Sequence, residues 1–265
     1  MSLITRRDFL AGTASQLALA AGPGGRVADW RVAGVRSNSQ AQQSRDGRLT
    51  ARVAHPTMVV EPGLRNLGLS TTSRNGLLYV PPSYRVDHPL PFILALHGAT
   101  QAGAGPMRLW REVAEQKGFV VLSPDSRAYT WDGILGGFGP DVEFIDQALR
   151  WTFDRVAVDA SRMTISGFSD GASYALSLGL ANGDLFQKVA AFSPGFIVPA
   201  EWRGQPRFFL SHGLSDPILP IEVTSRRIVV QLQRGGYSVR LREFDGGHEV
   251  PPAVLAEAVD WLTAR

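Results

Sequence analysis

The chain has 265 residues, 44% of them hydrophobic and 19% charged, which is the composition of a globular protein with one large domain or two small ones. It contains no cysteine, which excludes disulfides, thiolate metal ligands and a cysteine nucleophile. No run of about eighteen apolar residues occurs, so we expect no stable membrane span.

The net charge of +3 is unevenly distributed along the chain. The first 52 residues hold eight Arg and three Asp, a net charge of +5, whereas the remainder holds nineteen basic and twenty-one acidic residues, a net charge of −2. The remainder has no cluster of Lys and Arg interleaved with aromatic residues. We therefore expect no nucleic-acid partner.

The N-terminus resembles a twin-arginine export signal. Arg6 and Arg7 are followed by Phe9, Leu10, a weakly apolar stretch and the small residues "ALA" at positions 18–20. This pattern predicts a signal peptide over residues 1–20 and export to the periplasm or beyond the cell, although the Lys often found after the motif is missing. An amphipathic helix with two exposed arginines is the alternative.

Residues 21–60 are rich in Gly, Ser, Gln and Arg and contain few large apolar side chains. Such a segment buries too little surface to offset the entropy lost on ordering, so we expect a flexible linker. Residues 61–265 then form the folded domain.

Strand and helix patterns alternate through this domain. Short apolar or β-branched runs predict strands at 76–84, with the first of them at an edge of the sheet, and at 91–98, 119–125, 161–169, 188–195, 207–213 and 238–246. Segments with helical spacing predict helices at 106–118, 139–156, 170–183, 218–236 and 250–265. The order predicts an α/β fold with a mainly parallel, doubly wound sheet, in which ligands bind beyond the C-terminal ends of the strands.

One of these strand ends carries the pattern GxSxG, filled by Gly167, Ser169 and Gly171. A sharp turn from strand to helix exposes the serine hydroxyl, and glycines on both sides avoid clashes with the neighbouring backbone. The next amide, that of Asp170, starts the helix and points to where an oxyanion would form. A serine before a helix is also a common N-cap, so the pattern alone leaves both interpretations open.

A serine nucleophile needs a base and an acid that orients the base. Of five histidines, His248 lies in the glycine-rich loop after the last strand, where the chain order Ser, acid, His places the base. His97 and His212 end strands, where a histidine commonly packs locally. Asp216 follows the strand at 207–213 and is the expected acid; Asp245, three residues before His248, is the competitor.

The loop after the strand at 91–98 combines small residues with free amides in "LHGATQ". We expect its Ala99 amide to be the second oxyanion donor, with Thr100 as second choice. Residues 128–139, "AYTWDGILGGFG", form an aromatic loop, and its Tyr129, Trp131 and Phe138 are candidates for the wall of a substrate pocket.

These motifs resemble the phospholipase/carboxylesterase group of α/β-hydrolases, which includes the acyl-protein thioesterases. The matching segments are "LHGATQ", "GFSDG", "AFSPGF", "SHGLSDPILP" and "GGHEVP", within residues 76–265. "LHGATQ" is equally similar to polyhydroxybutyrate-depolymerase-like and feruloyl-esterase-like hydrolases, which often carry disulfides that this chain cannot form. Asp170 stands where the acyl-protein thioesterases usually carry Gln, which argues against their lipid-thioester substrates.

The expected function is therefore hydrolysis of small-molecule carboxylic esters through an acyl-enzyme on Ser169. No long insertion separates the strands, so we expect a minimal lid or none, and the chemistry calls for no metal or organic cofactor. A serine peptidase of the same fold and a catalytically inactive binding module are the alternatives. Nothing in the sequence indicates an oligomeric state.

Overall fold

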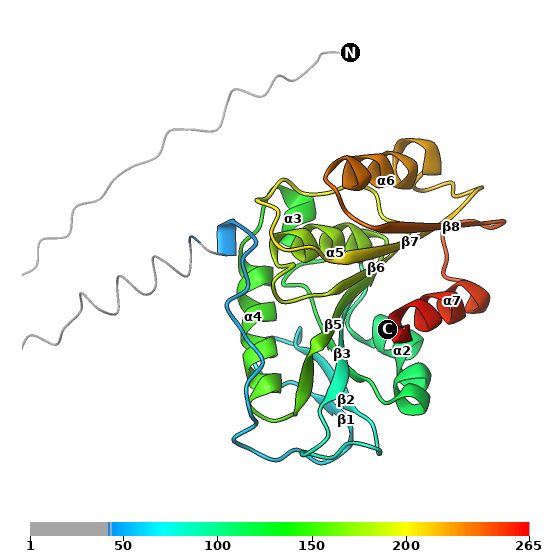
Figure 1. The fold of residues 1–265 in the computed structure, drawn as a ribbon. Helices are drawn as coiled ribbons and strands as arrows, with labels where there is room; N and C mark the ends of the chain where they lie inside the picture. Colours follow the sequence, from blue (N-terminus) through cyan, green and yellow to red (C-terminus); the bar gives the residue numbers. More distant parts are fainter. Residues whose placement is uncertain (1–41, 43, 265) are drawn as a thin grey trace, which may run out of the picture.

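The structure is a computed structural model, and it describes residue 42 and residues 44–264 (Figure 1). The predicted signal peptide and the first half of the predicted linker lie outside the described residues. Among the helices of the described part, none is long and apolar enough to cross a membrane.

The core of the fold is an eight-stranded sheet with the order β1-β2-β4-β3-β5-β6-β7-β8. β2 runs antiparallel to both of its neighbours, and all the remaining pairs are parallel. The mainly parallel, doubly wound sheet predicted from the sequence is confirmed. The strands are β1 (Gly63–Asn66), β2 (Gly76–Val80), β3 (Leu90–Leu96), β4 (Val120–Pro124), β5 (Val158–Phe168), β6 (Lys188–Phe192), β7 (Arg207–Gly213) and β8 (Val239–Phe244).

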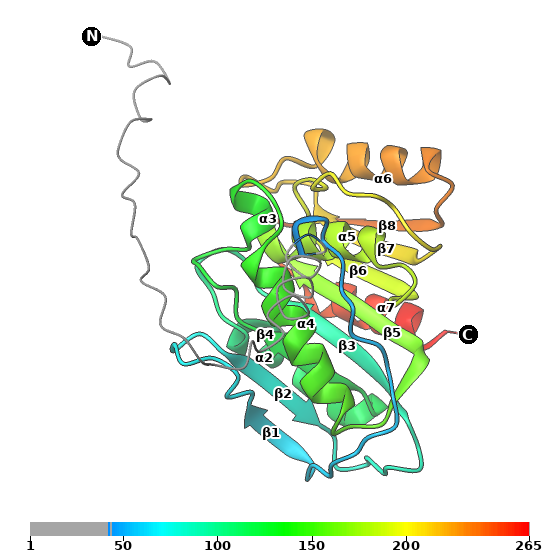
Figure 2. The same cartoon turned by 90° about the vertical axis from the view of Figure 1, so that its left-hand side faces the viewer.

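Helices cover both faces of this sheet (Figures 1 and 2). α4 and α5 lie on one face, and α2 and α7 lie on the other. The helical segments are α2 (Ala104–Lys117), α3 (Asp132–Leu135), α4 (Pro140–Phe153), α5 (Asp170–Ala181), the 3₁₀ turn η1 (Ile221–Val223), α6 (Ser225–Arg234) and α7 (Pro252–Thr263).

Each face of the sheet has its own hydrophobic core because side chains alternate along the strands. In β3, Leu94 and Leu96 face α4 and α5, whereas Ile93 and Ala95 face α2 and α7. All four side chains are fully buried, which explains why this strand reads as a continuous apolar run.

The structure corrects the predicted position of one strand and the predicted extent of one helix. The strand at residues 76–84 was expected at an edge, but β1 pairs with it and forms the edge instead. The single helix expected over 218–236 is divided into η1 and α6, because Thr224 adopts a non-helical conformation between them.

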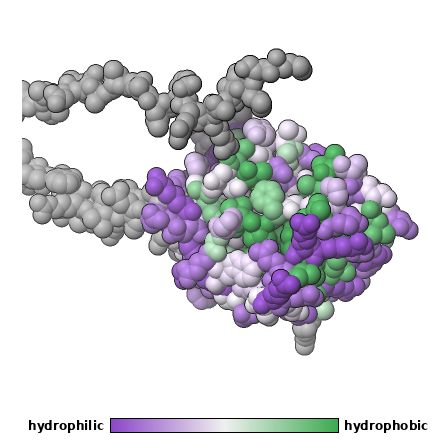
Figure 3. All heavy atoms as spheres, turned by 90° about the horizontal axis from the view of Figure 1, so that it is seen from above, coloured by the Kyte–Doolittle hydropathy of each residue, from purple (hydrophilic) through white to green (hydrophobic). Residues whose placement is uncertain are grey.

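α6 is strongly amphipathic. It buries Ile228 and Leu232 and exposes the arginines of its outer face. Figure 3 looks down on the side of the molecule at the top of Figure 1, where α6 lies, and shows hydrophilic and hydrophobic patches side by side.

Residues 44–53 correct the prediction of a flexible linker over 21–60. This segment, which we call the strap, runs beside α4 (blue in Figure 1) and buries Leu49 and Ala51, each only 1% exposed. The amide of Leu49 donates to Asn182, and the amides of Thr50 and Ala51 both donate to Asp146. The strap thus has hydrogen-bond acceptors on the body that its own composition does not reveal.

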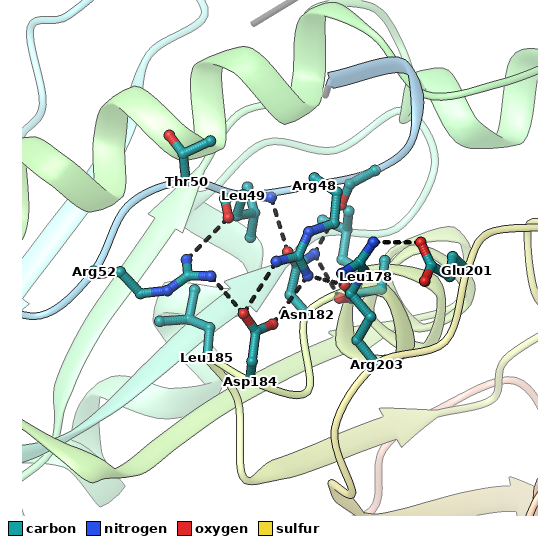
Figure 4. Close-up of polar contacts among 12 residues, drawn as sticks. Arg48, Leu49, Thr50, Arg52, Leu178, Asn182, Asp184, Leu185, Glu201 and Arg203 are labelled. Carbon is teal, nitrogen blue, oxygen red and sulfur yellow. Dashed lines mark hydrogen bonds and ion pairs between the residues drawn. The ribbon is translucent and has the colours of Figure 1, made fainter. Parts of the chain in front are cut away.

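Ion pairs fix the strap further (Figure 4). The guanidinium of Arg48 lies 3.0 Å from the Asp184 carboxylate, and that of Arg52 lies 2.6 Å from it. Hydrogen bonds from Arg48, and the ion pair with it, lower the pKa of Asp184 although burial acts in the opposite direction. Since these side chains are partly exposed, the buried Leu49 should stabilise the strap more than the ion pairs do.

We predict that Leu49→Ala lowers the free energy of unfolding by about 2–4 kcal/mol, because it leaves a cavity in a fully buried site. Leu135→Ala is the matched control, since Leu135 is 51% exposed, and it should change stability by less than about 1 kcal/mol. Urea denaturation measures both. Equal effects of the two substitutions would contradict a structural role of the strap.

Candidate active site

Ser169 occupies the turn between β5 and α5 in a strained conformation. Its φ of 56° and ψ of −120° are unfavourable for a residue with a side chain. A Cβ on Gly167 would lie 2.1 Å from the carbonyl oxygen of Gly171, and a Cβ on Gly171 would lie 2.4 Å from that of His97. The glycines of the GxSxG pattern are therefore required by backbone packing, as the sequence predicted.

The structure brings Ser169, His248 and Asp216 together from three loops. The Ser169 hydroxyl lies 2.8 Å from Nε2 of His248, whose Nδ1 lies 2.7 Å from Oδ2 of Asp216. With the proton on Nδ1, the histidine donates to the carboxylate and accepts from the serine. The His248 side chain is 15% exposed, while that of Asp216 is fully buried.

Asp216 is held as an acceptor by its own loop. Burial acts to raise its pKa, but hydrogen bonds from the Leu219 amide, His248 and the Ile218 amide outweigh burial, so the pKa lies below its ordinary value. The carboxylate therefore stays ionised beside the imidazole. In that state it can orient the ring and stabilise a positive charge on it.

The competing residues are placed elsewhere. Asp245 is exposed and makes no hydrogen bond to His248 within the described chain.

His97 is buried and bonds the Gly98 carbonyl and the Ser126 amide, and burial lowers its pKa. His212, also buried with a lowered pKa, bonds Leu219 and Ser225, and its Nε2 lies 3.2 Å from Asp216.

The amides of Ala99 and Asp170 are the expected oxyanion donors. Neither the Ala99 amide nor the Asp170 amide has a hydrogen-bond acceptor among the described residues, and the Asp170 amide lies at the N-terminus of α5. The Thr100 amide, our second choice, donates instead to the Tyr129 carbonyl at 2.7 Å. Of the two candidates in the loop after β3, Ala99 and Thr100, only Ala99 has an amide without a protein acceptor.

The Asp170 carboxylate is turned toward the aromatic loop and accepts a hydrogen bond from the Thr130 hydroxyl at 2.6 Å. The neighbouring Tyr129 carbonyl accepts from Thr100, and the Trp131 indole N–H donates to the His97 carbonyl at 2.8 Å. Residues 129–131 thus bond both the loop that carries Ala99 and the turn that carries Asp170. Thr130 was not predicted, because a lone threonine in a glycine-rich loop has no distinguishing pattern in the sequence.

Trp131 and Phe138 do not line a substrate pocket, which corrects the prediction. Trp131 has no exposed surface and stacks on Tyr174 with ring centroids 5.2 Å apart. Phe138 is 7% exposed and packs against Tyr174 and beneath Gly47 of the strap. Both rings serve as core, whereas Tyr129 is 61% exposed.

A reciprocal pair of carboxylates fixes the end of this aromatic loop. Asp132 accepts from the Asp141 amide at 2.7 Å, and Asp141 accepts from the Asp132 amide at 2.6 Å. Burial, together with the charge of Asp132, raises the pKa of Asp141 to about 6. The Tyr174 hydroxyl also donates to Asp132, so the loop is bonded to α5.

Residues 70–217 match the family model described as "Putative esterase". The chain belongs to this esterase family. It is similar to the probable feruloyl esterase C of Aspergillus terreus, with 24% identity over 170 residues that cover 61% of this chain and 62% of that protein. It is also similar to feruloyl esterase D of Neurospora crassa, with 26% identity over 179 residues, 60% of this chain and 61% of that protein.

The matches thus span about three fifths of the length of these curated relatives. Among solved structures, the fluorophosphonate-binding serine hydrolase F of Staphylococcus aureus superposes with a TM-score of 0.60 at 15% identity, covering 77% of this chain and all of that one. These comparisons confirm the α/β-hydrolase fold and the esterase-like group that the motifs indicated.

Proposed function

We propose that this esterase-family chain is a serine hydrolase that cleaves small-molecule carboxylic esters through an acyl-enzyme. The observation that carries the proposal is the unbroken hydrogen-bonded series Ser169, His248, Asp216, with distances of 2.8 and 2.7 Å. The amides of Ala99 and Asp170, the expected oxyanion donors, have no acceptor among the described residues. The feruloyl esterases named among its relatives support an ester as substrate.

In the proposed reaction, Nε2 of His248 takes the Ser169 proton as the serine oxygen attacks the ester carbonyl carbon. The amides of Ala99 and Asp170 stabilise the oxyanion, and the imidazolium returns the proton to the leaving alcohol as the C–O bond breaks. Water activated by His248 then cleaves the acyl-enzyme, releasing the acid and restoring Ser169. Asp216 holds the imidazole tautomer throughout.

Ser169→Ala should lower kcat/KM for short-chain aryl esters by at least about 10⁴-fold, because the nucleophile is lost. It should also abolish labelling by a fluorophosphonate probe, while the thermal unfolding transition shows that the variant is folded. Retained labelling or hydrolysis would exclude Ser169 as nucleophile. A labelled wild type that cleaves peptides but no ester would favour the peptidase, and an unlabelled wild type would favour the binding module.

Thr130 is proposed as a positioning residue, because its hydroxyl holds the Asp170 carboxylate and thereby the turn that presents the Asp170 amide. Thr130→Val keeps the shape of the side chain but removes this hydrogen bond, and we expect kcat to fall about tenfold with KM nearly unchanged. Thr130→Ser restores the hydroxyl and should recover most of kcat. An equal loss in both variants would contradict the assignment.

For the N-terminus we propose a twin-arginine signal over residues 1–20, and we propose that the catalytic domain includes the strap as well as residues 61–265. Replacing both Arg6 and Arg7 by Lys should prevent export, because a receptor reads the arginine pair. Cell fractionation with immunoblotting measures this in a host with the twin-arginine pathway. Unchanged export of the Lys variant, with export of the wild type as control, would contradict the proposal.

A further inference from the structure

A pocket of about 280 Å³ lies beside the proposed nucleophile, on the face of the sheet covered by α2 and α7. Its inner wall contains Trp110 of α2, Phe192 of β6 and Ser166 of β5, all buried. The half-exposed Leu109 and Val250 and the exposed Gln101 lie nearer the surface. The pocket therefore combines aromatic side chains in its inner wall with access to solvent, where the exposed Arg108 also lines it.

The pocket adjoins Ser169 through two shared residues. Gly98 lines it, and a Cβ on Gly98 would lie 3.5 Å from Cβ of Ser169. Phe168 also lines it, and the Phe168 ring centroid lies 4.8 Å from that of His248. Because Gly98 has no side chain, a group bonded to an ester carbonyl at Ser169 can extend over it.

Ser166 is a buried polar residue in the lining of the pocket. The Ser166 hydroxyl is buried and has no hydrogen-bond partner among the described residues, although buried hydroxyls are normally paired. A hydroxyl of this kind can donate to or accept from a polar atom carried by a bound group.

We propose that this pocket is a specificity subsite, resting on the proposed function, that takes an apolar portion of the ester of about aromatic-ring size. Phe168, Leu109 and Val250 contact its apolar body, and Ser166 bonds a polar atom that it carries. The acyl portion and the alcohol portion of an ester are both attached at the carbonyl centre, so either can supply this group.

Val250→Phe tests the subsite because the larger ring fills the pocket from its half-exposed side. We expect kcat/KM to fall at least tenfold for esters with an aromatic group on the portion that the pocket holds, and to change less than threefold for methyl acetate. Two substrate series separate the sources: methyl esters of acetic, benzoic and 3-phenylpropanoic acids, and acetates of methanol, phenol and benzyl alcohol. A loss confined to the first series assigns the acyl portion, and a loss confined to the second assigns the alcohol portion.

Val230→Phe is the matched control, since Val230 is 45% exposed on α6 and does not line the pocket. It should leave both series unchanged. Leu109→Phe fills the pocket independently from α2 and should reproduce the selectivity of Val250→Phe. If both pocket variants retain wild-type selectivity, or lose methyl acetate hydrolysis as strongly as the aromatic esters, the subsite is overturned. A wild type that cleaves no ester in either series contradicts the proposed function itself.

Ser166→Ala tests the role of the Ser166 hydroxyl. It should fold normally, because no protein hydrogen bond is lost, and it should retain the hydrolysis of esters with an unsubstituted ring. We expect the rate advantage of a ring with a terminal hydroxyl over the unsubstituted ring to fall about fivefold relative to the wild type. An unchanged advantage would exclude contact between Ser166 and the substrate.

Discussion

The site depends on one backbone constraint, the left-handed conformation of Ser169 between β5 and α5. The strand and the helix approach so closely at this turn that Gly167 and Gly171 leave no room for a Cβ atom. This packing offsets the unfavourable φ of Ser169, which costs about 1–3 kcal/mol at such positions. The strained turn in return places the hydroxyl against His248 and puts the next amide, that of Asp170, at the N-terminus of α5.

Polar groups that take no part in the proposed reaction hold the segments that carry the Ala99 and Asp170 amides. Residues 129–131 bond the loop of Ala99 through a carbonyl and an indole, and bond the turn of Asp170 through a hydroxyl. Both amides are therefore positioned against one common segment, which is in turn fixed by the Asp132 and Asp141 pair. The Asp170 carboxylate that follows Ser169 thus has a structural partner in the Thr130 hydroxyl.

The sequence predicted those features that local chemistry determines. The GxSxG turn and the buried strands follow from short-range patterns, whereas Asp216 and His248 were expected from the chain order Ser, acid, His of the α/β-hydrolases. Trp131 and Phe138 were misplaced, because an aromatic side chain on a loop has the same pattern whether it lines a pocket or packs into the core. The strap was misjudged for a related reason: its acceptor Asn182 is 133 positions away from Leu49, and no local composition reveals such a partner.

The strained turn and the pocket beside it are built from the same backbone, and this limits how specificity can change. Phe168 precedes Ser169 directly, and Gly98 precedes Ala99, so a change at either residue disturbs the turn or the oxyanion loop along with the pocket. Leu109 lies on α2 and Val250 lies two residues after His248, and both line the pocket while packing against the core of that face. Of the two, Leu109 is on an element that carries none of the three residues Ser169, Asp216 and His248, so a substitution there reshapes the proposed subsite with the least effect on the geometry of Ser169.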